Sequence, residues 1–185
     1  TKIESHKKYI RDISRINADA KKDLEEKIST KKSEIKSLQA DSLSRTEEIQ
    51  QLRPGLQESR NKVRDIIFGL KTEEGESNNK IKSLVKESKF YENNESCPTC
   101  EQDITAELKE RKLGEAKTTA TELQSRLTEI GQRQREAEVE FNRLEAIAQE
   151  CTDREHKIFD NNQQIERLEG DIDFLETDID TLTDG

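Results

Sequence analysis

Residues that are mostly apolar recur at seven-residue intervals on both sides of the middle of the chain. The first series comprises Ile28, Ile35, Ser42, Ile49, Leu56, Val63, Leu70, Ser77 and Leu84. The second series comprises Ala116, Leu123, Ile130, Ala137, Leu144, Cys151, Ile158, Ile165, Ile172 and Ile179. A seven-residue repeat keeps one stripe of a helix facing a partner helix. The sequence therefore predicts an all-α fold, a long antiparallel intramolecular coiled coil in the form of a helical hairpin.

The composition supports long helices over a globular core. Charged residues make up 39% of the chain, hydrophobic residues 29% and aromatic residues only 4%. That is too little apolar material for the core that 185 residues would otherwise build. Disorder is the alternative for such a composition, but disordered chains do not repeat their apolar residues every seven positions. The presence of only seven Gly and two Pro also favours uninterrupted helices.

The net charge of −9 disfavours a helical arm that grips RNA or DNA, and it disfavours an anionic membrane surface. No apolar run reaches the roughly 18 residues of a membrane span, and no signal peptide opens the chain. We therefore expect an intracellular protein. Its three cysteines are an odd number, too sparse for a secreted disulfide framework, which favours metal binding or redox chemistry.

Two of those cysteines stand close together at the centre of the chain, at Cys97 and Cys100, with Pro98 and Thr99 between them as the predicted turn. Ninety-six residues precede Cys97 and 85 follow Cys100. Two thiolates make half of a tetrahedral zinc site, so a second copy of the tip is the economical source of the other half. This predicts a homodimer with one Zn²⁺ held by four cysteines. A redox dithiol and a disulfide between the two cysteines remain alternatives.

Apolar residues beside the cysteines are predicted to support this joint. Phe90, Tyr91 and Ile104 would cover the metal and touch the partner chain, because aromatic residues are scarce elsewhere. The alternative is that they close the end of the intramolecular seam. Thr99 or Asp103 is expected to cap the N-terminus of the returning helix.

The chain is expected to divide into an outgoing helix (1–92), an apex (93–103) and a returning helix (104–185). Pro54 and Gly55 should interrupt the outgoing helix and act as a hinge. A second interruption is expected at 72–79, which is poor in apolar residues and could loop out. The returning series changes phase between Phe141 and Ile147, since its companion residues move from three before to three after each member. Folding at the midpoint of the cysteines would place residues whose numbers add up to about 197 opposite each other, so Pro54 would face about residue 143.

Residues 90–104, set between two heptad arms, resemble the zinc hook of the SMC-like ATPases of the SbcC and Rad-fifty type, and phage members of that family most of all. The resemblance implies that Cys97 and Cys100 are zinc ligands and that Pro98 shapes the turn. It also implies a tether in DNA double-strand-break repair and recombination, with a partner nuclease and DNA bound at flanking ATPase heads. For a phage protein it would imply the host cytoplasm. This segment has no phosphate-binding loop, so we expect no enzymatic activity from it. Many members carry Gly after the second cysteine, where this chain has Glu101.

Overall fold

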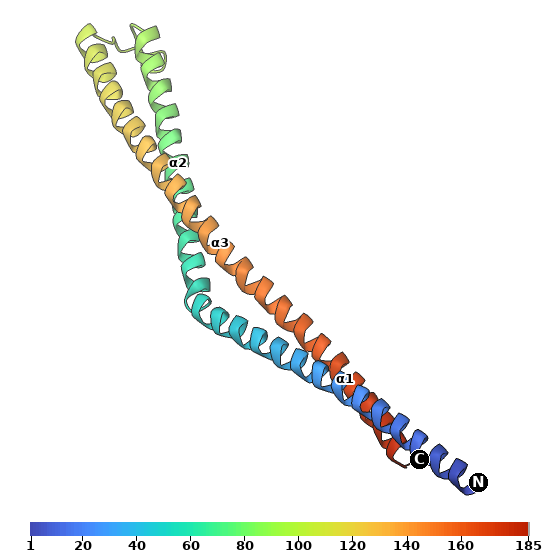
Figure 1. The fold of residues 1–185 in the computed structure, drawn as a ribbon. Coiled ribbons are helices and arrows are strands. Elements are labelled where there is room, and N and C mark those ends of the chain that lie inside the picture. The colour runs from blue at the N-terminus through green and yellow to red at the C-terminus, as the bar shows by residue number, and fades with distance from the viewer. Residues whose placement is uncertain (185) are drawn as a thin grey trace. The chain divides into compact units, whose positions relative to one another are not determined.

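The structure is a computed structural model that describes residues 1–184. Three helices account for most of it: α1 (Lys2–Leu52), α2 (Leu56–Asn93) and α3 (Ala106–Asp184), shown in Figure 1. Within the described residues there is no β-strand, and the only strand-like pairing is an isolated bridge between Ser96 and Asp103. The prediction of an all-α fold is therefore confirmed.

The chain divides into two compact units. One consists of Thr1–Pro54 with Ala148–Gly185 and is called here the α1 unit; the other, Gly55–Ile147, is called the tip unit. Each unit pairs two helical segments that run in opposite directions, because the residue numbers on one segment fall as those on the other rise. In the α1 unit the partners are α1 and the C-terminal half of α3; in the tip unit they are α2 and the N-terminal half of α3 (Figure 1).

The α1 unit buries the stripe that the seven-residue repeat predicts. Its buried apolar residues are Ile28, Ile49, Cys151, Leu168 and Ile172. Ion pairs flank this stripe and join the two helices, as between Lys31 and Asp171 at 3.3 Å and between Arg154 and Glu48. Their members are partly or fully exposed, so each pair stabilises the fold by less than about 1 kcal/mol. The buried stripe supplies the main stabilisation through the removal of apolar surface from water.

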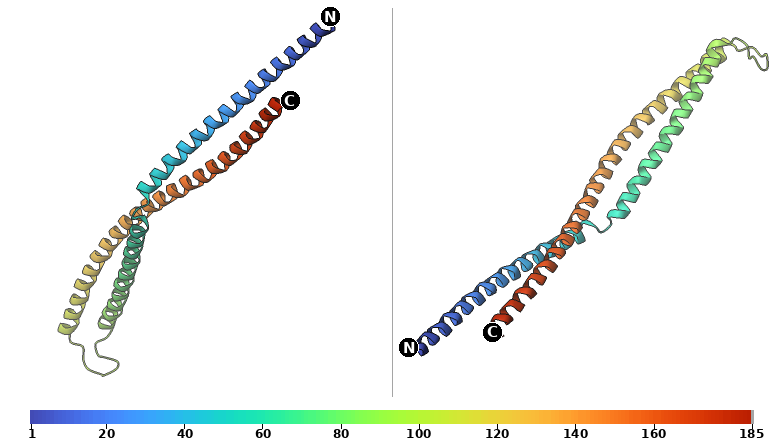
Figure 2. Two further views of the ribbon diagram at one scale, coloured as in Figure 1. Left: turned by 90° about the horizontal axis from the view of Figure 1, so that it is seen from below. Right: turned by 90° about the vertical axis from the view of Figure 1, so that its right-hand side faces the viewer.

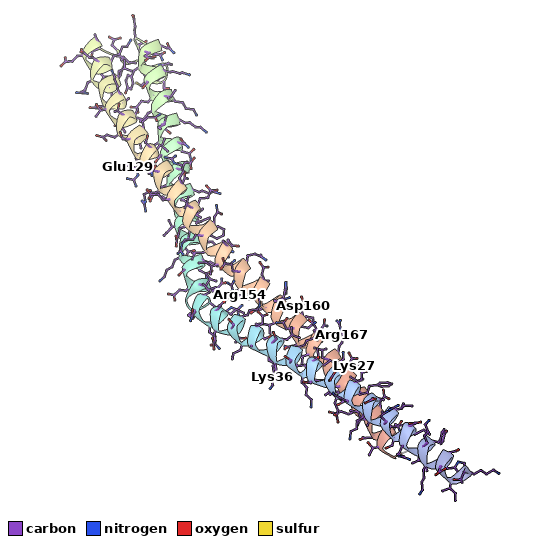
Figure 3. The ribbon with its side chains drawn as sticks, in the orientation of Figure 1. Lys27, Lys36, Glu129, Arg154, Asp160 and Arg167 are labelled. Carbon is purple, nitrogen blue, oxygen red and sulfur yellow. The ribbon has the colours of Figure 1, made fainter. Side chains whose placement is uncertain are left out.

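Exposed charged side chains cover the outside of the α1 unit. Lys27 and Lys36 extend from α1, and Asp160 and Arg167 extend from α3 (Figure 3). This mixture of signs over a narrow apolar stripe is the pattern of a solvated helical pair. In residues 1–184 we find no helix that has both the length and the hydropathy of a membrane span.

The tip unit has its own apolar cluster. Leu70 on α2 and Ile130 on α3 are each 2% exposed, and they pack with Ala137. Val63 and Ile67 complete the cluster. Beside it, the guanidinium of Arg64 lies 5.7 Å from the centre of the Phe141 ring, within the range of a cation–π interaction.

Most members of the outgoing series are followed by a second, half-buried residue on the same face of the helix, called here its companion. The spacing between member and companion differs between α1 and α2. In α1 the half-buried companions follow the series by three residues, as Leu38 follows Ile35. In α2 they follow by four, so Ile67, four residues after Val63, is packed inward whereas Ile66 is 48% exposed. The predicted phase change of the returning series is confirmed by burial: half-buried Phe141 precedes buried Leu144 by three residues, and buried Asn161 follows half-buried Ile158 by three.

The predicted interruption at Pro54 and Gly55 is present, since α1 ends at Leu52 and α2 begins at Leu56. Proline removes a backbone donor and crowds the preceding turn. Gly55 has φ = 73° in the left-handed region, where a residue with a Cβ would be strained. No atom lies within 4 Å of the position that a Cβ would occupy there, so the backbone angle is the only requirement for glycine.

The second predicted interruption, at 72–79, is wrong, because α2 continues through it without a break. Tertiary contacts hold the segment in spite of its poor local preference. Glu73 accepts a hydrogen bond from Arg126 at 3.5 Å, Glu74 pairs with Gln134, and the small side chain of Ser77 is buried on the seam.

The register also differs from the expected one. Hydrogen-bonded residues on facing helices have numbers that add up to 202 for Asp41 with Asn161 and 203 for Ser42 with Asn161, compared with the expected value of about 197. By this register Pro54 faces about residue 149, not 143. Ile3 and Ile10, in the first turns of α1, are 68% and 66% exposed.

Candidate metal centre at the tip

Residues 94–105 form the loop that joins α2 to α3 and closes the far end of the tip unit (Figure 2). Two backbone hydrogen bonds of 2.8 Å hold its sides together. The Cys97 N–H donates to the Gln102 carbonyl, and the Ile104 N–H donates to the Glu95 carbonyl. The bridge between Ser96 and Asp103 lies between these two bonds. The loop is therefore a short antiparallel ladder that presents the two cysteines at its end.

The cysteine turn is closed by a third bond of 2.8 Å, from the Glu101 N–H to the Cys97 carbonyl. Pro98 and Thr99 lie inside this turn and are exposed. The backbone N–H of Cys100, and after it that of Thr99, donates to the Cys97 sulfur and lowers the pKa of that thiol. A lowered pKa favours the thiolate, which is the form that binds metals and acts as a nucleophile.

The cysteine turn carries two free thiols. Cys97 is half-buried, Cys100 is exposed, and neither is in a disulfide. In the part of the chain that the structure describes, no three His, Cys, Asp or Glu side chains are grouped so that they could hold a metal. Zinc in structural sites takes four ligands. One chain offers two sulfur donors from one turn, half of the number that such a site takes.

Glu101 has φ = 60° and is the only residue other than glycine with positive φ among residues 1–184. It occupies the position at which many members of the resembled family carry glycine. Left-handed backbone costs a residue with a Cβ roughly 1 kcal/mol. The hydrogen bond from its N–H to the Cys97 carbonyl contributes to holding this conformation.

The residues predicted to support the joint lie next to the loop. Phe90 and Tyr91 belong to the last turn of α2, and their rings meet edge to face with centroids 5.2 Å apart and an interplanar angle of 83°. Asn94 closes this helix by donating from Nδ2 to the Phe90 carbonyl at 2.8 Å. Phe90, Tyr91 and Ile104 are all half-buried, so part of each side chain faces solvent at the tip.

The residue that caps α3 is neither Thr99 nor Asp103, so that prediction is wrong. The hydroxyl of Thr105 accepts the Leu108 N–H at 3.1 Å, and α3 begins at Ala106. Thr99 lies in the cysteine turn and Asp103 in the bridge, which leaves Thr105 as the capping residue. A threonine directly before a run of good helix formers was the available signal.

The tip is acidic throughout. Between positions 90 and 108 the sequence has five carboxylates and neither Lys nor Arg; the five are Glu92, Glu95, Glu101, Asp103 and Glu107. All five are exposed. The two cysteines thus lie in a field of negative charge, which attracts cations and repels a second tip.

Comparison of the chain with protein-family models, with curated proteins and with solved structures gives no match.

Proposed function

We propose that the chain is a hairpin-shaped coiled coil whose tip is a zinc-dependent dimerisation hook. Two chains would share one Zn²⁺, each contributing Cys97 and Cys100. The observation that carries the proposal is the pair of free thiols on one exposed, hydrogen-bonded turn, with half of a tetrahedral ligand set. By resemblance, the hook would tether molecules of a DNA double-strand-break repair ATPase, whose heads bind DNA and a partner nuclease.

The chemistry of the tip supports a structural metal rather than a catalytic one. A bound Zn²⁺ would link two chains through coordination bonds to their cysteine sulfurs. The chain's part is to hold both sulfurs on one turn and to favour the thiolate of Cys97 through the N–H groups of Cys100 and Thr99. We assign no catalytic residue to this segment.

The proposal predicts half a zinc ion per chain and a dimer that a chelator separates, because four thiolates are needed and each tip brings two. Metal analysis and mass measurement in solution, with and without chelator, test this under reducing conditions. One zinc per chain would contradict the shared site. So would a dimer that withstands both chelation and thiol reduction.

A spacer whose cysteines crosslink under oxidation, without metal, is the second candidate. Its support is the exposure of Cys100, which a partner thiol could reach. The two functions separate cleanly in one titration. A hook dimer persists in reductant and dissociates in chelator, whereas a disulfide dimer does the reverse.

We propose that Phe90, Tyr91 and Ile104 contact the partner tip. Replacing Phe90 and Tyr91 together by Ala should weaken zinc-dependent association by roughly tenfold or more, since buried aromatic residues dominate interface energies. The same change should lower the melting temperature only slightly. Phe68→Ala is the control, because Phe68 is an aromatic residue of α2 with 74% exposure. A larger effect on melting than on association would show that the two rings close the intramolecular seam instead.

We propose that Pro54 and Gly55 form a flexible link between α1 and α2. Replacing both by Ala should raise the helix content and protect this segment from proteolysis, because alanine restores a donor and favours helical φ. Gly69→Ala is the matched control; Gly69 lies inside α2 and also has open space around a Cβ. Equal cleavage near residue 54 in the native and double-variant chains would contradict a flexible link.

A further inference from the structure

Asn161 is a polar residue in a position where the repeat calls for an apolar one. It lies on α3, three residues after Ile158, and is 1% exposed. Its Nδ2 donates to Asp41 Oδ2 at 2.8 Å and to the Ser42 hydroxyl at 3.1 Å, both on α1. An amide side chain buried in a helical pair costs stability unless its hydrogen bonds are made. Here they are made across the pair, to two neighbouring residues.

The acceptors are themselves held in place. Arg45, one turn further along α1, donates from Nε to Asp41 at 2.8 Å, and the charge of Lys157 on α3 also acts on that carboxylate. Ser42 belongs to the seven-residue series and faces the seam. In the described residues, no buried side-chain nitrogen or oxygen lacks a partner. Asn161, Asp41, Ser42 and Arg45 therefore form a completed network, called here the polar lock.

We propose that the polar lock fixes the axial register of α1 against α3 in the α1 unit. The rest of the seam repeats every seven residues, so an apolar stripe alone would fit almost as well after a slip of one heptad, about 10 Å along the helix. Only a feature that occurs once can distinguish these registers. The polar lock is such a feature.

A slip of one heptad leaves the lock incomplete whichever way it goes. Asn161 would then face Ile35 beside Glu34, or Ile49 beside Glu48. Either glutamate could accept one amide hydrogen in place of Asp41, but neither isoleucine can replace Ser42 as the acceptor of the other. In one of these slips Ser42 would face Leu168, so the half-buried Ser42 hydroxyl would also lose its partner across the pair. An unpaired buried donor or acceptor disfavours the slipped state by roughly tenfold or more.

The ion pairs around the seam distinguish the native register from a slipped one less strongly than the polar lock does. Lys31 pairs with Asp171, and a slip in one direction would bring Asp178 to it instead. These side chains are partly exposed, and such pairs contribute little. The polar lock is independent of zinc, since all of its residues belong to the α1 unit.

Disulfide trapping in the full-length chain tests the lock. In a background of Cys97→Ser, Cys100→Ser and Cys151→Ala, Ile172→Cys is combined with one cysteine on α1. Lys31→Cys reports the observed register, and Leu24→Cys and Leu38→Cys report slips of one heptad in the two directions. Intramolecular crosslinking is followed under mild oxidation in dilute solution. With Asn161 present, we expect the Lys31→Cys pair to form at least about tenfold faster than the slipped pairs.

The Asn161→Leu variant should lower the preference for the Lys31→Cys crosslink by at least about threefold, because leucine packs against apolar residues in the native and the slipped registers alike. Asn162→Leu is the matched control. Asn162 is next to Asn161 but is exposed, so this variant introduces the same substitution outside the seam and the native preference should remain. A second variant, Asp41→Leu with Ser42→Leu, removes the two acceptors of Asn161. It provides the same test of register if the Asn161→Leu chain unfolds without cooperativity. An unchanged preference in these variants, or equal rates for all three pairs in the native background, would overturn the proposal.

Discussion

Replacement of Cys97 or Cys100 by Ser is expected to abolish the zinc-dependent dimer. Each substitution removes one of two thiolates per chain, so a pair of tips would offer two sulfur ligands in place of four. We expect zinc affinity to fall by at least about a hundredfold, because metal binding supplies the association energy. Sedimentation or light scattering with added zinc, together with metal analysis, measures both effects.

The helix content of these variants should stay close to that of the native chain, because the buried stripe lies in the paired helices and not in the tip. Cys151→Ala is the matched control. Cys151 is 2% exposed on the seam of the α1 unit, so its loss should reduce stability while leaving zinc binding intact. A Cys100→Ser chain that still dimerises with half an equivalent of zinc would rule out the proposed ligands.

Leu70→Ala is expected to lower the free energy of unfolding of the tip unit by about 2–5 kcal/mol. Leu70 is 2% exposed and packs with Ile130 and Ala137 in the main apolar cluster of the unit. Removing its side chain loses buried apolar surface and leaves a cavity between two helices that cannot easily close. Denaturant unfolding followed by circular dichroism measures the change.

Phe68→Ala serves as the control for this experiment, since Phe68 lies two residues away with 74% of its surface exposed. Its removal should change the unfolding free energy by less than about 0.5 kcal/mol. Equal losses for the two variants would mean that α2 does not bury the face described here.

The heptad series predicts which faces are buried, because burial in a helical pair depends on a period that can be counted directly. Pro54 and Gly55 predict the helix break for an equally local reason. The segment 72–79 could not be judged in this way, since contacts of Glu73 and Glu74 with α3 override its weak preference for helix. The same holds for Ile66 and Ile67, where the side that faces α3 is decided by the changed phase after the break.

At the tip, the sequence identifies the cysteines and the turn between them, because thiol spacing and proline have direct geometric consequences. The hydrogen bonds that lower the pKa of Cys97 follow from the backbone path and cannot be read from residue types. Thr105 is the third residue of the loop that could cap α3, after Thr99 and Asp103, and residue type alone does not distinguish the three. Asn161 does not stand out in a pattern of apolar residues, although a lone polar residue on a seam is itself a signal of register.

The five carboxylates between positions 90 and 108 have a consequence for how the proposed joint would open. Two tips brought together carry ten negative side-chain charges at close range, and four thiolates exceed the charge of one Zn²⁺ by two more. Like charges at this distance repel, and salt screens them. Without the metal, two tips would therefore dissociate and would not remain as a weak dimer. Loss of the ion and separation of the chains would be a single event. Higher ionic strength would lengthen the lifetime of the dimer, because salt screens the repulsion between the tips.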